Sequence, residues 1–242
     1  MDDHSDRGHV GQAAMLNSEI QAVMAMMRQN STWAVVPTYY DEETTDDPLL
    51  EDFKALRRRV FGWKDFKSLD PNVYLSPFLA VVRSVKTSGP ITGIALSALY
   101  KFLTYEIFDV NTVWAAEAMH NIADAVTHCR FEATDHASDE VVLSKILEVL
   151  LACLRCDCGS LLTDDDVCSI VQAAFRIGQP AGPSSQASEL LQRTARHTLL
   201  EIVRIIFRQL PSLPEDTPVP PASPPQVTPP STPPYAVSAA PA

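Results

Sequence analysis

Apolar residues dominate the middle of the chain, from Gly89 to Leu103, and they recur at helical spacing. Placed at about 100° per residue, they cover roughly 220° of arc, whereas a surface helix needs a stripe only a little over ~100° wide. The segment is therefore predicted to be a helix that neighbours cover on more than one side. Burying its larger side chains yields ~1.5–3 kcal/mol each, while ordering the backbone costs ~1–2 kcal/mol per residue. The apolar positions are Ile91, Ile94, Ala95, Leu96, Ala98, Leu99, Phe102, Leu103 and Tyr105.

The same spacing predicts helices on both sides of this central one. Asp47-Pro48 and Asp70-Pro71 are typical helix starts, because proline suits the first helical position. Asn111-Thr112 and Asp135 are predicted to cap helices, and Thr163 with Asp166 matches a capping box. We expect the first helix to end at the polar run 30–33. The other flanking helices are expected from 48, from 71, over about 111–129 and 135–154, from 163 to about 177, and over 189–210.

About eight helices and no convincing strand place the chain in the all-α class. Helices joined by short connections are typical of antiparallel pairs stacked into an armadillo- or HEAT-like layer. No strict repeat period is visible, so the repeats are expected to be degenerate.

Composition sets the limits of the folded part. Of the 19 prolines, 12 fall between Pro211 and Pro241. Residues 211–242 are therefore predicted to be a disordered, proline-rich linker, residues 1–12 a disordered lead-in, and residues 13–210 the helical domain. The acidic run 41–47 is expected to be a solvated loop.

The net charge of −11 argues against nucleic-acid binding, which needs a basic surface. The amino terminus lacks the basic and apolar regions of a signal peptide, and no apolar run reaches the ~18 residues that suggest a membrane span. Five cysteines outside a secretory context indicate reduced thiols in the cytosol.

A zinc site is the metal centre that the cysteine spacing raises. Cys153, Cys156, Cys158 and Cys168 supply four thiols, but no second Cys-x-x-Cys pair completes a zinc motif, so free thiols are the preferred interpretation. The histidines stand in no motif, and neither a phosphate-binding glycine loop nor a nucleophile elbow is present. We therefore predict no catalytic, cofactor-binding or metal-binding residue.

Several charged residues border apolar faces, as in the rim of a protein–protein interface. Lys101 lies at the edge of the polar arc of the central helix, and Glu140 lies in the first turn of a later one. From the residues alone, an internal or exposed ion pair is the preferred interpretation of these two. The triple arginine 57–59 fits an anionic partner or, more simply, a solvated face. A stripe on the last helix fits an anionic partner or membrane surface, and a soluble outer face is an equally good interpretation: Arg193, Arg196, Arg204 and Arg208.

A family resemblance is carried by short segments that follow one another along 13–210. Together they resemble the DCB (dimerisation and cyclophilin-binding) domain at the amino terminus of the large Arf guanine-nucleotide exchange factors. The match is to the Golgi brefeldin-resistance branch, which includes the Gea and GNOM proteins. The segments are Asn30-x-x-Trp33, Asp47-Pro48-Leu49-Leu50, Pro71-Asn72-Val73-Tyr74-Leu75-x-Pro77-Phe78-Leu79, Gly89-Pro90-Ile91-Thr92-Gly93, Ala123-Asp124-Ala125-Val126-Thr127-His128 and Ala137-Ser138-Asp139-Glu140-Val141-Val142-Leu143.

The resemblance implies a regulatory domain that is not an enzyme. Such domains form homodimers, contact the HUS domain that follows them, and help to place the exchange factor, a cytoplasmic protein peripheral to Golgi membranes. In this branch a lysine and a glutamate that match Lys101 and Glu140 are associated with self-association, which reverses the preference for a simple ion pair. A Rab-type GTPase and cyclophilin are further possible partners. The alternative function is a monomeric scaffold that binds such a GTPase or the following domain. The exchange domain itself is missing from this sequence.

Overall fold

The computed structural model describes residues 3–34, 47–63, 66, 68–132, 136–179 and 188–209. Within these ranges the all-α class is confirmed, and a single isolated bridge, Ser88 with Glu132, is the extent of β pairing. The helices are α1 (Asp3–Ala34), α2 (Pro48–Val60), α3 (Pro71–Arg83), α4 (Gly89–Thr104), α5 (Ala115–Thr127), α6 (His136–Arg155), a short 3₁₀ helix η1 (Asp157–Leu161), α7 (Asp164–Gly178) and α8 (Glu189–Gln209).

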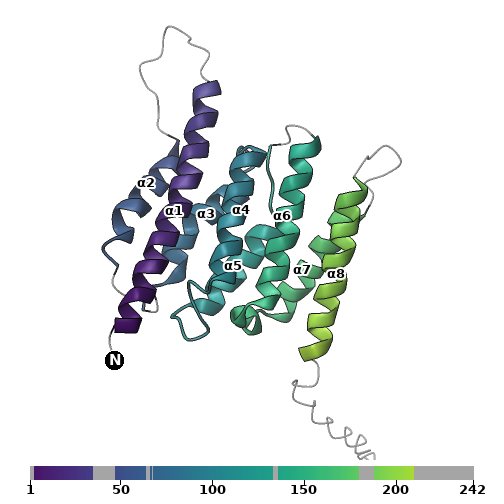
Figure 1. Ribbon diagram of the computed structural model, residues 1–242. Coiled ribbons are helices and arrows are strands. Elements are labelled where there is room, and N and C mark those ends of the chain that lie inside the picture. The colour runs from purple at the N-terminus through teal and green to yellow at the C-terminus, as the bar shows by residue number, and fades with distance from the viewer. Residues whose placement is uncertain are drawn as a thin grey trace, which may run out of the picture.

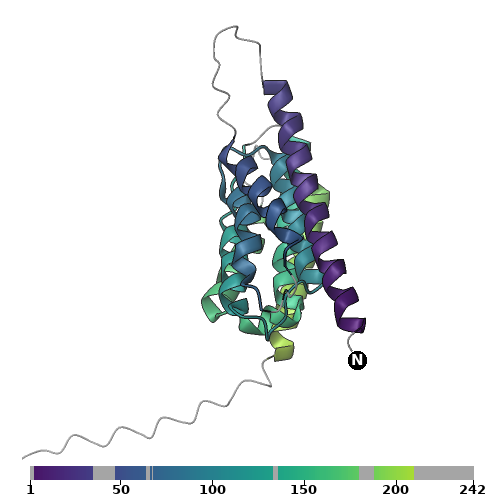
Figure 2. The same ribbon diagram turned by 90° about the vertical axis from the view of Figure 1, so that its left-hand side faces the viewer.

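The helices form two layers, which are seen face-on in Figure 1 and edge-on in Figure 2. Helices α1, α4, α6 and α8 contact one another in turn and make one layer, called here the α4 layer; α2, α3, α5 and α7 make the other. The two layers are joined by contacts of α1 with α2, α3 with α4, α5 with α6, and α7 with α8. This arrangement is compatible with the predicted stack of helical repeats.

Helix α4 lies at the centre of this stack, as its wide apolar arc predicts. It packs against α1 and α6 within its own layer and against α3 across the layers. Ala95, Leu96, Leu99 and Phe102 are completely buried, and the ring of Phe102 meets that of Phe78 edge-on, with centroids 5.2 Å apart. A single polar face is left for solvent, and the candidate site is built on it.

The predicted helix starts are confirmed where the cap acts locally. The carboxylates of Asp47 and Asp70 accept hydrogen bonds from the backbone N–H two residues on, and a proline follows each of them. Thr163 and Asp166 form the predicted capping box at the start of α7. These caps satisfy N–H groups that have no partner within the helix.

The predicted start of α5 is wrong, because Asn111-Thr112 does not cap it. The Thr112 hydroxyl accepts a hydrogen bond from the backbone N–H of Asp109 and donates one to the Asp109 carboxylate. It therefore closes a turn before the helix. Trp114, with φ of 63° in the left-handed region, then redirects the chain, and α5 begins at Ala115.

Helix α1 is longer at both ends than the sequence predicts. It begins at Asp3 rather than Ala13 and continues through the polar run 30–33 to Ala34. Once the packed part of a helix has formed, each added residue gains a hydrogen bond without a new nucleation cost. The Gln12 side chain also donates a hydrogen bond to the Ile107 carbonyl, which ties this part of α1 to the rest of the protein.

Several predictions lie outside the described residues: the acidic loop up to residue 46, the Asp135 cap and the proline-rich linker 211–242. Among the helices that are described, none combines the length and the apolar character that crossing a membrane requires.

The His120–Asp166 contact between α5 and α7 should make stability depend on pH. His120 Nδ1 lies 2.7 Å from Asp166 Oδ1. Burial by itself raises the pKa of Asp166, but hydrogen bonds from Thr163 and His120 outweigh it and lower that pKa below the usual 3.8. A lowered folded-state pKa stabilises the fold at higher pH, and this stabilisation is lost as the pH falls through the folded-state value.

We therefore expect Asp166→Ala to lower the free energy of unfolding by about 1–2 kcal/mol at pH 7, through the lost cap and charged hydrogen bond. The difference from the unsubstituted protein should shrink as the pH falls below about 4, where the unfolded state begins to bind the proton. The part that is due to charge is lost once the pH is below the folded-state pKa. Urea unfolding followed by circular dichroism at a series of pH values measures this. The matched control is Asp165→Ala, an exposed neighbour in the same turn; an equal loss in both variants would contradict the assignment.

Candidate interaction site

The outward face of the α4 layer carries a cleft of about 350 Å³ where α4 and α6 end, called here the α4–α6 cleft. The two helices run in the same direction, as two contacts between them show. Near their amino-terminal ends, Gly89 of α4 packs against the Val142 side chain of α6. Further along, the Lys145 ammonium donates a hydrogen bond to the Ser97 hydroxyl. Their carboxyl-terminal ends therefore lie side by side, and the cleft opens between them.

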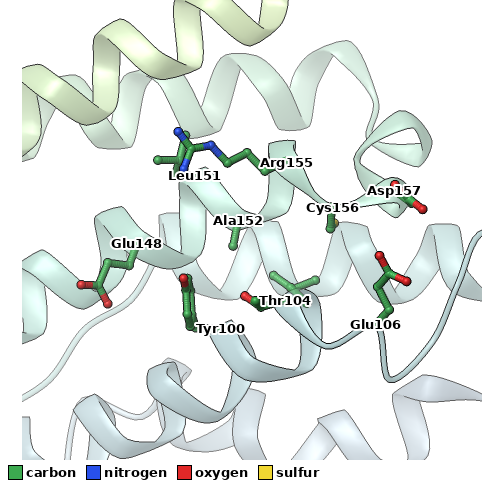
Figure 3. Close-up of a pocket in the computed structure, with 10 residues that line it drawn as sticks. Tyr100, Thr104, Glu106, Glu148, Leu151, Ala152, Arg155, Cys156 and Asp157 are labelled. Carbon is green, nitrogen blue, oxygen red and sulfur yellow. The ribbon is translucent and has the colours of Figure 1, made fainter. Parts of the chain in front are cut away.

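The α4–α6 cleft has an apolar middle and carboxylates at its ends (Figure 3). Tyr100 points from α4 toward α6, where it faces Ala152. Glu148 lies at one end, and Glu106 and Asp157 lie at the other, with the Glu106 carboxylate pointing across the opening. All three acidic side chains are exposed. The cleft is thus shaped to receive an apolar group that carries positive charge beside it.

The one cation that lines the α4–α6 cleft is already paired. The Arg155 guanidinium extends toward α8 and donates a hydrogen bond of 2.9 Å to the Glu201 carboxylate. Hydrogen bonds from Arg204 and Arg155 lower the pKa of Glu201, which keeps it ionised. Within the described chain, no ion pair neutralises Glu106, Glu148 or Asp157. Negative charge in the cleft is therefore left for a partner.

Lys101, next to Tyr100 in sequence, forms an ion pair inside the protein. Its ammonium lies 2.7 Å from the Glu19 carboxylate of α1, whose side chain is only 8% exposed, whereas the Lys101 side chain is 44% exposed. The ion pair that the residues alone suggested is thus present, with a partner that the sequence analysis missed. In the sequence, Glu19 lies between Leu16 and Ile20 in the buried apolar stripe of α1. A carboxylate at such a position indicates a buried charge that needs a partner, and this signal could have identified Glu19.

Glu140 connects a different pair of helices in the α4 layer, α6 and α8. Its carboxylate accepts a hydrogen bond from the backbone N–H of Ser188, just before α8 begins. Since Ser97 lies opposite Lys145, Lys101 and Glu140 are offset by about nine residues along the parallel helices, or roughly 13 Å. The two residues therefore lie on one face but toward its opposite ends. Beside them, Tyr100 and Val141 expose 40% and 56% of their surfaces.

The predicted arginine stripe lies on the outer side of α8, at the edge of the stack. Arg193 and Arg204 form short-range ion pairs with Glu189 and Glu201 on the same helix, and Arg196 and Arg208 are exposed. Between the arginines, three large apolar side chains are exposed: Leu200, Val203 and Phe207. The stripe is thus mixed, basic and apolar, rather than the purely polar outer face of a terminal helix.

The cysteines do not assemble into a metal site. All five are free thiols; Cys153 is completely buried, whereas Cys168 is exposed on α7. Burial raises the pKa of the Cys153 and Cys156 thiols, and it raises the pKa of Cys129 and Cys158 to about 12. Among the residues that the structure describes, no three His, Cys, Asp or Glu side chains are grouped to hold a metal ion.

Comparison with known proteins relates the chain to exchange factors for Arf GTPases. It is 48% identical over 209 residues to the ARF guanine-nucleotide exchange factor GNL1 of Arabidopsis thaliana, and 46% identical over 202 residues to GNOM of the same plant. It is also 38% identical over 199 residues to the Golgi-specific brefeldin A-resistance guanine nucleotide exchange factor 1 homolog of Caenorhabditis elegans. These matches cover 86%, 83% and 82% of this chain but only 14%, 14% and 10% of the relatives. No protein-family model matches the chain.

Removing Lys101 should destabilise the fold, because the buried Glu19 carboxylate would lose its counter-ion. We expect Lys101→Met to lower the free energy of unfolding by about 1–3 kcal/mol. Adding Glu19→Gln to Lys101→Met should recover most of the loss, since a neutral amide needs no counter-ion. Urea unfolding of the single and double variants measures this. Additive effects of the two substitutions would show that the ion pair contributes nothing.

Thiol reactivity should separate Cys168 from the other four cysteines. At mildly alkaline pH, one thiol of the native protein should react rapidly with Ellman's reagent, because thiolate formation and access control the rate. Cys168→Ser should remove this fast phase, and all five thiols should react in denaturant. A fast phase that persists in Cys168→Ser would contradict the burial of the others.

Proposed function

Since the chain is homologous to one region of the large Arf guanine-nucleotide exchange factors, we propose that it serves them as a non-catalytic regulatory and dimerisation domain. In this proposal it is the DCB domain, through which the exchange factor associates with a second copy and with other parts of its own chain. The chain spans about one seventh of the length of GNL1 and GNOM, because the matches cover 14% of each. Loading of Arf with nucleotide is assigned to the remainder of such a protein.

The observation that supports self-association most strongly is the outward face of α4 and α6. Apolar side chains, Tyr100 and Val141, are exposed there next to Lys101 and Glu140. An exposed apolar centre with charged residues around it is typical of a protein–protein interface. Lys101 remains half exposed although it pairs with Glu19, so it can contact a partner while it holds α1 in place.

The mixed stripe on α8 supports a second contact surface. Leu200, Val203 and Phe207 are exposed among Arg193, Arg196, Arg204 and Arg208 on the last described helix of the stack. This surface suits the HUS domain of the same protein or an anionic membrane surface, to which basic and apolar side chains contribute together. Association with a Rab-type GTPase or a cyclophilin, and a cytoplasmic location peripheral to Golgi membranes, follow from the resemblance and are part of the proposal.

The solution mass of the 242-residue chain tests the proposal. We expect a dimer by sedimentation equilibrium, and a monomer for Lys101→Ala/Glu140→Ala with the helical circular dichroism signal retained. The matched control is Glu19→Gln, which removes the internal partner of Lys101 but changes no exposed group; it should stay dimeric.

A chain that remains monomeric at every concentration would contradict self-association and favour the alternative, a monomeric scaffold for a GTPase or for the following domain. A double variant that loses its helical signal would show instead that Lys101 and Glu140 act in folding. Some fall in the thermal midpoint is expected in either case, because Lys101 also pairs with Glu19. An interface role therefore requires that the variant be monomeric at a temperature where its helical signal is still complete.

A further inference from the structure

A second cleft, between α1 and α2, is lined by basic side chains, whereas the charged side chains of the α4–α6 cleft are mainly acidic. It measures about 420 Å³ and is called here the α1–α2 cleft. Four of its residues, from Lys54 of α2 to Phe61 just after that helix, recur at i, i+3, i+4 and i+7. This spacing places them in a row about 10 Å long on one helix face. The cleft is lined by Met24, Arg28, Lys54, Arg57, Arg58 and Phe61.

The end of this row projects an apolar group with cations beside it. Phe61 is 69% exposed, and Arg57 and Arg58 are exposed in the last turn of α2. Neither arginine has an ion pair with any residue that the structure describes. Cations at a helix carboxyl end are favoured by the helix dipole, and this accounts for the arginines. It does not account for a phenyl ring left in water beside them.

We propose that Phe61, with Arg57 and Arg58, docks into the α4–α6 cleft of a second copy of this chain; the inference rests on the proposed self-association and names its contact. The receiving cleft has an apolar middle for the ring, formed by Tyr100 and Ala152. Its ends carry Glu106, Glu148 and Asp157 for the guanidinium groups. Arg155 does not compete with the incoming arginines, because Glu201 already holds it.

The contact is reciprocal, because each copy carries one projecting phenyl and one receiving cleft. Two such contacts related by a two-fold axis close a dimer, whereas a single one would extend into a chain of molecules. Each contact brings two arginines to three carboxylates around a buried aromatic ring. Paired opposite charges around an aromatic anchor are the usual composition of the residues that dominate binding energy.

Substitutions that reverse the charges on each side of the proposed contact provide the test. Arg57→Glu/Arg58→Glu places carboxylates beside the projecting Phe61 of a copy whose α4–α6 cleft is already acidic. Glu106→Lys/Glu148→Lys makes the α4–α6 cleft basic in a copy whose projecting arginines are unchanged. Each variant alone should dimerise at least roughly tenfold more weakly than the unsubstituted chain, because like charges meet at both contacts. An equimolar mixture should form a heterodimer of native mass, because every contact is again between opposite charges. Phe61→Ala should weaken the dimer by roughly tenfold or more without lowering its thermal midpoint.

Two control variants each reverse a single charge of the same kind elsewhere on the protein. Arg59→Glu lies in the same turn of α2 but does not line the cleft, and Glu117→Lys lies on α5 in the other layer. Both should dimerise as the unsubstituted chain does. Sedimentation equilibrium of each protein and of the mixture measures the dissociation constants, and thermal unfolding by circular dichroism confirms that each variant is folded.

The outcomes separate this inference from the proposed function. If the unsubstituted chain is monomeric, the proposed self-association fails and the contact fails with it. If the chain is dimeric but the charge-reversed variants or Phe61→Ala dimerise equally well, the contact is wrong and self-association stands. A mixture that does not restore the dimer also overturns the contact. Weakening that extends to Arg59→Glu and Glu117→Lys would indicate a general charge effect and would likewise overturn it.

Discussion

Helix α4 carries apolar side chains around most of its circumference, and no single neighbour is able to cover them. Two helices of its own layer and one of the other therefore pack against it. This requirement explains the two-layer stack, because a central helix that must be covered on three sides needs a neighbour on either flank and a third helix behind it. Its remaining polar edge, with Ser97, Tyr100 and Lys101, faces outward. The candidate surface is thus the part of α4 that is not buried in the core.

Local chemistry explains which elements the sequence predicts correctly. Asp47, Asp70 and the Thr163–Asp166 box act within three residues of themselves, so their roles are visible in the sequence. Thr112 has the same chemistry but a nearer competitor, since Asp109 engages its hydroxyl in a turn. The start of α1 was missed because a packed helix extends into sequence with little apolar pattern of its own.

The charged residues show where sequence reasoning ends. Periodicity marked Lys101 as a charge at the margin of an apolar face, but its partner Glu19 lies 82 residues away along the chain. The two clefts combine residues from separate helices, so neither is visible in a sequence pattern. Only the parallel alignment of α4 with α6 brings Glu106 and Glu148 to one opening. Recognising such a site requires the register between helices, which is a property of the packed structure.

The charges on this protein fall into two groups with different consequences. Lys101, Glu140 and Arg155 are engaged across seams between helices of one layer, so they hold the layer together. By contrast, Glu106, Glu148 and Asp157 in one cleft, and Arg57 and Arg58 in the other, form no ion pair with a residue that the structure describes, so they are available to a partner. Two copies with a net charge of −11 repel each other at long range. At physiological salt this repulsion is screened beyond about 8 Å. The proposed self-association would therefore depend on opposite charges that meet at close contact, and the two clefts carry unpaired charges of opposite sign.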